Sequence, residues 1–314
     1  MTQSLPQSSV PILTIGTRGS PLALAQTRLV RARLCAALGC VEEEIAVAVI
    51  RTSGDMIQDR PLAEAGGKGL FTKEIEEALI ARRIDLAVHS AKDVPTVLPD
   101  GLSLAACLPR EDARDVFISR VAKTIAELKP GAVVGTASMR RQALVRRLRP
   151  DVRVVTLRGN VGTRLRKLEA GEVDATLLAL AGLNRLGLSD AATTILGIDE
   201  FLPAVGQGII AIEVRAADRR VHEQLQAIND EAAKTALTAE RAFLAALDGS
   251  CRSPIAGHAT MEEGNVRFRG MILREDGSEA LETQRAGAAA EAEALGFDAG
   301  QELRRRAGPG FLVG

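Results

Sequence analysis

The sequence contains no tryptophan and no tyrosine, and only seven of its 314 residues are phenylalanine. Proteins that bind single-stranded nucleic acid by stacking need aromatic platforms, so this composition argues against that class. No apolar run reaches the ~20 residues that a membrane-spanning helix needs. The first residues, MTQSLPQSSVPIL, lack the basic region and apolar core of a signal peptide. We therefore expect a cytoplasmic protein with no nucleic-acid or membrane partner, and we interpret residues 1–11 as a disordered tail.

Cysteine is scarce, and no CxxC pair occurs among Cys35, Cys40, Cys107 and Cys251. Cys35 and Cys40 have a spacing that a metal site or a disulfide can use, but no second pair accompanies them. We expect no metal ion, and free thiols of the kind kept in a reducing cytosol. An excess of charge is also absent, since 40 basic residues balance 40 acidic ones. This balance does not indicate binding to a large polyanion.

Apolar residues make up 46% of the chain, which at this length predicts two or three domains with substantial cores. Short β-branched runs alternate with helical patterns along the first two thirds. The predicted strands are residues 12–18, 45–50, 84–90, 102–108, 132–136, 152–158 and 174–180. This alternation predicts an α/β fold in which helices cover both faces of a parallel sheet. The stretches IGTRGSPLALAQTRLVRARL and VGTASMRRQALVRRL share a pattern of strand, Gly-Thr, serine and helix, which indicates two related α/β domains.

The last third of the chain has a different pattern. Helical periodicity covers about 218–228 and 235–247, and three short runs separated by turn residues follow. We expect strands near 255–260, 265–273 and 279–284, and then a final helix interrupted near Gly296. The predicted domains are 12–108 with 209–228, 109–208, and 229–314, the last a small α+β domain with a three-stranded antiparallel sheet.

The stretch HSAKDVP, residues 89–95, directly follows a predicted strand. In such sheets ligands bind at the carboxyl ends of the strands, so Lys92 and Asp93 are candidates for a site. Asp93 can act as a general acid or stabilise a developing cation. Lys92 can form a Schiff base or contact an anion. The alternative is a solvated loop in which Asp93 is only a turn residue.

A basic cluster lies between Arg140 and Lys167, where ten lysines and arginines accompany a single acidic residue, Asp151. Arg140 and Arg141 fall in the first turn of a predicted helix, which is unfavourable for cations unless an anion lies there. Guanidinium groups bind carboxylates or phosphates through two parallel hydrogen bonds. We therefore expect an anion site at Arg140, Arg141, Arg158 and Arg164. A solvated basic face is the alternative, and it is our interpretation of Arg146, Arg147, Arg149 and Lys167.

Two loops complete the set of candidates. GGKGLF, residues 66–71, lacks the Walker A pattern, and its glycines predict a mobile loop that carries Lys68 near the cleft or an ordinary hinge before a helix. DGSCRSP, residues 248–254, places Cys251 among turn residues and beside Arg252. A structural cysteine would be expected on an apolar face, so we interpret Cys251 as an accessible thiol.

These motifs resemble those of the porphobilinogen deaminase family, also called the hydroxymethylbilane synthases. The stretches that carry the resemblance are GTRGSPLALAQ, GGKGLFTKEIEEAL, HSAKDVPT, GTASMRRQ, LRGNVGTRLRKL, LPAVGQG and GSCRSPIAG. They occur in the family's order and at similar spacings. The resemblance implies a transferase of tetrapyrrole biosynthesis that deaminates four porphobilinogen molecules and joins them into the linear hydroxymethylbilane. It also implies two α/β domains similar to those of periplasmic binding proteins.

The resemblance implies a role for individual residues as well. Cys251 matches the cysteine that holds a dipyrromethane cofactor by a thioether, and Asp93 matches the catalytic carboxylate. Lys68 matches a basic residue of the loop over the site, whereas Glu64 stands where the family often has a basic residue. The positions that match those holding the carboxylates of cofactor and substrate are Arg18, Ser20, Lys92, Ser138, Arg140, Arg141, Arg158, Arg164 and Arg185.

Two other functions fit parts of the pattern. A non-enzymatic anion-binding protein would also have two α/β lobes around an arginine-lined cleft, but it would carry no covalent adduct. An enzyme that forms a Schiff base through Lys92 would be labelled at Lys92 by borohydride reduction in the presence of substrate. We expect neither, and we expect the protein to be a monomer.

Overall fold

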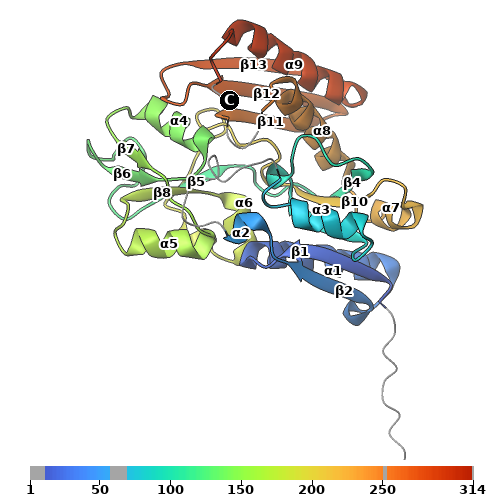
Figure 1. Ribbon diagram of the computed structural model, residues 1–314. Coiled ribbons are helices and arrows are strands. Elements are labelled where there is room, and N and C mark those ends of the chain that lie inside the picture. The colour runs from blue at the N-terminus through green and yellow to red at the C-terminus, as the bar shows by residue number, and fades with distance from the viewer. Residues whose placement is uncertain (1–10, 57–68, 250–252, 313–314) are drawn as a thin grey trace, which may run out of the picture.

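The computed structural model describes residues 11–56, 69–249 and 253–312. Three sheets lie side by side in the described chain, two of five strands and one of three. The two larger sheets lie next to each other, and the third covers one end of the pair (Figure 1). No helix among the described residues is long and apolar enough to cross a membrane.

The first sheet has the strand order β2-β1-β3-β10-β4. Its strands are β1 (Leu13–Arg18), β2 (Ile45–Ile50), β3 (Leu86–Ser90), β4 (Leu102–Cys107) and β10 (Ile210–Arg215). β1 pairs with β2 and β3 in parallel, whereas β10 runs antiparallel to both of its neighbours. The helices of this part of the chain are α1 (Pro21–Leu38), α2 (Ser53–Met56), α3 (Lys73–Ile80) and α7 (Arg219–Gln226).

The second sheet repeats this plan with the order β7-β6-β8-β5-β9. Its strands are β5 (Asp115–Ser119), β6 (Val133–Gly135), β7 (Arg153–Val155), β8 (Ala175–Ala179) and β9 (Thr194–Ile195). Here β5 is the antiparallel strand. Its helices are α4 (Met139–Leu148), α5 (Val161–Glu169) and α6 (Leu180–Leu186). The sheets confirm the predicted two related α/β units. The expectation of purely parallel sheets is wrong, because β10 and β5 run antiparallel to their neighbours. The sequence patterns also did not predict the strands β5, β9 and β10 or the helix α6.

The chain crosses between the two larger sheets twice, from β4 to β5 and from β9 to β10. The strand that follows each crossing is the antiparallel one, so β5 and β10 occupy equivalent places in their sheets. The two crossing segments contact each other, because the Glu111 N–H donates to the Gly208 carbonyl at 3.1 Å. Ile210, where the second crossing enters β10, pairs with Ser90 at the carboxyl end of β3, and β1 runs parallel to β3. The carboxyl ends of β1 and β3 therefore lie at the edge of the first sheet where this crossing arrives.

The third sheet is antiparallel, as predicted, and consists of β11 (Ile255–Glu262), β12 (Asn265–Leu273) and β13 (Ala280–Ala288). It packs with α8 (Glu231–Ala246) and α9 (Ala292–Ala307) around a core that contains Phe243 and Phe268. The predicted interruption near Gly296 is wrong, because α9 is continuous through this residue. A Cβ at Gly296 would lie 2.0 Å from the Ala239 carbonyl oxygen of α8, so glycine serves close helix packing here rather than breaking the helix.

Candidate active site

The carboxyl end of β3 leads into a single 3₁₀ turn, Ala91–Asp93, that carries the two candidates Lys92 and Asp93. The Ala91 N–H donates to the Ile209 carbonyl at 2.9 Å, which fixes the turn against the segment that leads into β10. Gly206 allows this approach, since its φ is +73° and a Cβ there would lie only 3.0 Å from the backbone nitrogen of Lys92. The turn is therefore held at the crossing between the two larger sheets.

Asp93 presents its carboxylate to solvent, with 36% of the side chain exposed. Among the described residues its ion-pair partner is Arg18 from the end of β1, whose Nη1 lies 3.9 Å from Asp93 Oδ2. Arg18 also stacks on the Phe71 ring, 4.1 Å from its centroid, and donates from Nε to Asp55 Oδ2 at 3.2 Å. Arg18 is thus oriented by two other residues while it faces Asp93.

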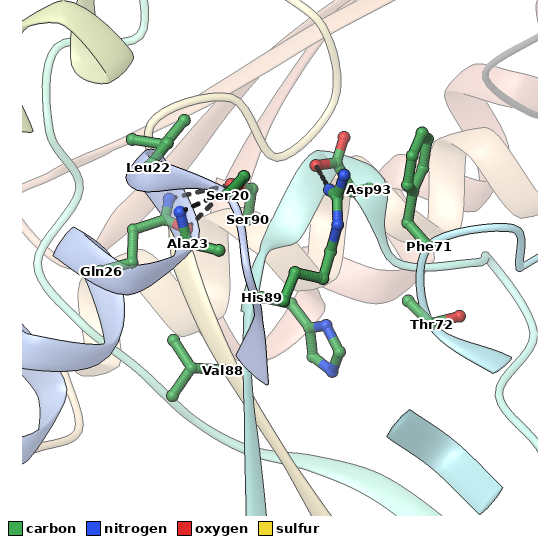
Figure 2. A pocket seen from close by; sticks show the side chains of 11 residues that line it. Ser20, Leu22, Ala23, Gln26, Phe71, Thr72, Val88, His89, Ser90 and Asp93 are labelled. Carbon is green, nitrogen blue, oxygen red and sulfur yellow. Dashed lines mark hydrogen bonds and ion pairs between the residues drawn. The ribbon is translucent and has the colours of Figure 1, made fainter. Parts of the chain in front are cut away.

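A pocket opens beside Asp93, lined by side chains from α1, β3 and the start of α3. Ser20 and Gln26 lie on one side of it, and Phe71 and Thr72 lie on the other (Figure 2). His89 also lines this pocket, but its Nε2 lies 3.1 Å from Glu213 Oε2 of β10. Since both side chains are buried, His89 and Glu213 help to hold β3 on β10 below the pocket.

Asp55 shows how Arg18 is held. Burial raises the pKa of Asp55, but hydrogen bonds from Arg18 and Thr52 outweigh it and keep this pKa below its usual value. Asp55 is therefore a permanent partner of Arg18 at neutral pH. Sequence reasoning did not predict this role, because Asp55 lies in α2, far from β1 along the chain.

Lys92 points toward the second sheet. Its Nζ donates to Gln207 Oε1 at 3.2 Å, and Gln207 Nε2 in turn donates to Asp115 Oδ1 at 3.0 Å. Burial and the nearby Arg141 lower the pKa of Lys92 to about 8. Lys92 from the first sheet and Arg141 from the second therefore belong to one electrostatic cluster.

Arg140 and Arg141 flank Asp115, the first residue of β5. Arg140 Nη2 lies 2.7 Å from one carboxylate oxygen, and Arg141 Nη2 lies 2.6 Å from the other. All three side chains are buried, and Arg140 and Arg141 also donate to the carbonyls of Leu202 and Leu177. Although burial raises the pKa of Asp115, the two arginines outweigh it and bring that pKa to about 2.

Asp115 changes the interpretation of the basic cluster. The sequence argument required an anion near Arg140 and Arg141 at the start of α4, and Asp115 is such an anion within the chain itself. Two guanidinium groups share one carboxylate, so one unit of positive charge remains uncompensated within this group. No local pattern indicated this contact, because Asp115 comes about 25 residues before the arginines.

Three helix N-termini close to the cluster lack acidic residues in their first turns, those of α1, α4 and α5. Their caps are Ser20, Ser138 and Asn160, whose side chains accept backbone N–H bonds from Ala23, Arg141 and Thr163. Ser20 and Ser138, which the family match places near cofactor carboxylates, thus cap helices whose positive ends favour anions. Each hydroxyl accepts a bond in the cap and keeps its own proton to donate.

Arg164 lies in the first turn of α5 and donates from Nε to the Gly159 carbonyl at 2.8 Å. Burial and the nearby Arg141 lower its pKa to about 10, and Arg158 acts in the same direction, whereas Asp93 opposes this shift. Arg164 and Asp93 are therefore close enough to interact across the two sheets. Arg185 of α6 contacts the segment that leads into β10, where its Nη2 donates to the Gly208 carbonyl at 2.6 Å.

Four of the sequence predictions lie outside the described residues: Cys251, Lys68, the departure at Glu64 and the tail at residues 1–11, of which only residue 11 is described. The other three cysteines are free thiols. Burial raises the pKa of Cys35 to about 11 and that of Cys107 to about 12, so neither is an activated nucleophile. Among the described residues no group of histidine, cysteine or carboxylate side chains has the arrangement of a metal site.

Comparison with known proteins identifies two family models on this chain. Residues 13–223 match the porphobilinogen deaminase dipyromethane cofactor binding domain, and residues 234–305 match the porphobilinogen deaminase C-terminal domain. Curated porphobilinogen deaminases from Nitrobacter winogradskyi and Nitrobacter hamburgensis are 63% and 62% identical to the chain over 302 residues. Each match covers 96% of this chain and 96% of the relative.

Solved structures that the comparison matches to this chain include a putative methionine-binding lipoprotein from Bacillus subtilis and a periplasmic binding protein from Salmonella typhimurium. The first is 13% identical and covers 71% of this chain and 92% of its own, with a TM-score of 0.42. The second is 12% identical and covers 71% and 93%, with a TM-score of 0.39. The family models and the curated relatives, by contrast, extend over nearly the whole sequence, and the chain belongs to the porphobilinogen deaminase family.

Proposed function

We propose that the cleft between the two larger sheets deaminates four porphobilinogen molecules and joins them head to tail into hydroxymethylbilane, a step of tetrapyrrole biosynthesis. Membership of the family supports this reaction. The observation that carries the assignment to this cleft is the half-exposed carboxylate of Asp93, which stands at a strand end among Arg18, Lys92 and Arg164. A carboxylate that faces solvent among cations can serve a cationic reaction centre without losing its own solvation.

The residues of the cleft fit the dipyrromethane that the family carries. Its two pyrrole rings bear four carboxylates in total. The cations of the cleft lower one another's pKa values, since Arg141 lowers the pKa of both Lys92 and Arg164. Such crowding is relieved when carboxylates bind between the cations. The residues proposed to hold these carboxylates are Arg18, Ser20, Lys92, Ser138, Arg140, Arg141, Arg158, Arg164 and Arg185.

Arg140 and Arg141 contribute to this binding mainly through their charge. Their described hydrogen bonds go to Asp115 and to backbone carbonyls, so they are held rigidly in place. The positive charge that Asp115 leaves uncompensated is also felt by Lys92, whose pKa Arg140 and Arg141 both lower. The serine hydroxyls and the helix ends of α1 and α4 supply directional hydrogen bonds beside that charge.

Asp93 is the proposed catalytic carboxylate. As the carbon–nitrogen bond of the substrate's protonated aminomethyl arm breaks, ammonia leaves with the bonding electron pair and a cationic azafulvene remains. The Asp93 carboxylate stabilises this cation and accepts a hydrogen bond from the pyrrole N–H. When bound, the dipyrromethane supplies the pyrrole carbon to which the first substrate becomes bonded. Arg18 fixes the position of Asp93, because Asp55 and Phe71 hold its guanidinium group.

Cys251 is the proposed attachment point, through a thioether. The high thiol pKa values of Cys35 and Cys107 support this choice, since their sulfurs are poor nucleophiles.

We also propose Lys68 as a basic contact of the loop over the site. The domain boundaries predicted from the sequence remain our proposal, and the strands of each sheet fall within one of these units. The proposed working form is a cytoplasmic monomer with porphobilinogen as its small-molecule partner.

Intact mass spectrometry tests this proposal directly. The purified wild-type chain is expected to exceed its sequence mass by two linked pyrrole units. Cys251→Ala removes this increment and the bilane-forming activity, whereas the matched control Cys40→Ala retains both. An adduct that survives in Cys251→Ala would contradict the attachment point. A wild-type chain at its bare sequence mass would favour the non-enzymatic anion-binding protein instead.

A further inference from the structure

The C-terminal end of α1 brings two cysteines together. The helix ends at Leu38, and Gly39 follows in the left-handed conformation with φ +66°. The N–H groups of Gly39 and Cys40 both donate to the Cys35 carbonyl, the latter at 3.1 Å. The bond from Cys40 spans six residues and is the bond that defines a Schellman helix end.

A Schellman end commonly places the side chain two positions past the helix against a side chain of its last turn. In most helices this contact joins two apolar residues, but here it joins Cys35 and Cys40. The neighbouring Cys40 side chain is one of the causes that raise the pKa of the Cys35 thiol. Both also belong to the apolar cluster between α1 and the first sheet, Cys35 as a buried member and Cys40 packed on its edge.

We propose that Cys35 and Cys40 are a reversible oxidation site, which hydrogen peroxide converts from a dithiol into an intramolecular disulfide across the end of α1. This inference is independent of the proposed catalytic function. It concerns neither Cys251 nor any residue placed in the cleft.

The two thiols differ in a way that sets the order of events. Cys35 is only 9% exposed, whereas Cys40 is half-buried at the surface. Burial, contact with Cys40 and the nearby Glu42 together raise the pKa of Cys35 to about 11. Cys40 is therefore the sulfur that meets the oxidant first, and Cys35 is the resolving thiol.

The chemistry balances in two steps. The Cys40 thiol loses its proton, and the thiolate attacks one oxygen of hydrogen peroxide while the oxygen–oxygen bond breaks. The departing hydroxide takes up that proton, so a sulfenic acid and one water form. The Cys35 sulfur then bonds to the Cys40 sulfur while the sulfur–oxygen bond breaks, which releases a second water. In total two thiols and one peroxide give one disulfide and two waters, and the two electrons lost by sulfur reduce the peroxide. The disulfide protects Cys40 from further, irreversible oxidation.

Peptide mapping tests this proposal on the full-length holoenzyme. Trypsin cleaves after Arg33 and Arg51, so both cysteines fall in one peptide, residues 34–51. After a small excess of hydrogen peroxide, alkylation and digestion, this peptide is expected to carry no alkyl group and to be lighter than the dithiol by two hydrogen atoms. Dithiothreitol before alkylation restores a doubly alkylated peptide. Cys107, in the peptide of residues 93–110, is the internal control and stays a thiol.

Two variants make the test sharper. In Cys35→Ala, Cys40 has no resolving thiol, so its peptide is expected to gain two oxygen atoms that dithiothreitol does not remove. In Cys40→Ala, Cys35 is expected to remain a thiol under the same dose. The proposal is overturned if the oxidised wild-type peptide still takes two alkyl groups, or if it carries oxygen at Cys40 in place of the disulfide.

Discussion

Asp93 and Asp115 both act on the charge of Lys92, one from each of the two larger sheets, yet their surroundings differ in almost every respect. Asp93 follows β3 with 36% of its side chain exposed, and its described ion-pair partner is 3.9 Å away. Asp115 begins β5 with no exposure and contacts Arg140, Arg141 and Gln207 at 3.0 Å or less. The first carboxylate is free to meet a substrate, whereas the second is fully engaged in holding other residues.

The difference shows how one kind of side chain serves two purposes in the same cleft. A buried carboxylate with several donors stabilises the arrangement around it, and removing it leaves buried charges without a partner. A half-exposed carboxylate with one distant partner contributes little to folding but keeps its charge available to a reacting group. We therefore expect Asp115 variants to change stability and Asp93 variants to change turnover.

The largest expected effect on stability comes from Asp115→Asn. This change keeps the shape of the side chain but leaves Arg140 and Arg141 buried without their carboxylate, so the free energy of unfolding should fall by about 3–5 kcal/mol. Chemical denaturation followed by circular dichroism measures it. The control Asp112→Asn removes a half-exposed partner of Arg114 and should cost at most about 1 kcal/mol. Equal stability of the two variants would contradict the structural role of Asp115.

The second effect is the acid sensitivity that Asp115 confers. Its pKa of about 2 in the folded chain lies below the ordinary value of 3.8, so its charge stabilises the fold above that value and this contribution is lost as the pH falls toward 2. Between these limits the free energy of unfolding of the wild type should fall by about 2 kcal/mol more than that of Asp115→Asn. If the free energies of unfolding of the two proteins fell in parallel with pH, the arginines would not lower the pKa of this carboxylate.

Sequence patterns predicted the parts of this comparison that depend on local information. Asp93 directly follows an apolar strand, and the position of a charged residue at a strand end is visible in one short stretch. Most strands of the three sheets were predictable for the same reason, because alternating runs and turn residues mark them, whereas β5, β9 and β10 were not predicted.

Asp115 was not predictable, because its role depends on residues that are distant along the chain. β5 is a five-residue strand placed by its antiparallel pairing with β8, and only this pairing brings Asp115 to Arg140 and Arg141. The predicted helix interruption at Gly296 was wrong for a related reason. Glycine predicts a helix break from intrinsic propensity, but the close packing of α8 on α9 outweighs that preference.

The third effect sharpens the contrast between residues that face the cleft and those that do not. Arg164→Gln should raise the KM for porphobilinogen about 10-fold to 100-fold, because one guanidinium–carboxylate contact contributes about 1.5–3 kcal/mol. Arg166→Gln is a matched control, since Arg166 lies on the same helix and is exposed. Steady-state kinetics measure the KM for porphobilinogen in both variants. Equal KM values for the two variants would place Arg164 outside the binding site.

The smallest expected effect is a pH dependence from Lys92. Because the pKa of Lys92 is about 8, it loses its positive charge as the pH rises from 7 to 9. The KM should therefore rise over this range, by about tenfold or less for the loss of one charged contact. Lys92→Arg keeps its charge and should remove the rise. If both proteins showed the same pH profile, another group would have to account for it.

The central claim is that Asp93 acts through its negative charge rather than through the fold, and turnover of two substitutions at that position tests it most directly. Bilane formation is measured for Asp93→Asn and Asp93→Glu, with circular dichroism as a check on folding and Asp100→Asn as an exposed control. Asp93→Asn should lose about 100-fold to 1,000-fold in turnover with an intact fold, because an amide cannot stabilise a cation. Asp93→Glu retains a carboxylate and should be at least about tenfold more active than Asp93→Asn. Near-wild-type turnover of Asp93→Asn, or equal losses in both variants, would contradict the account.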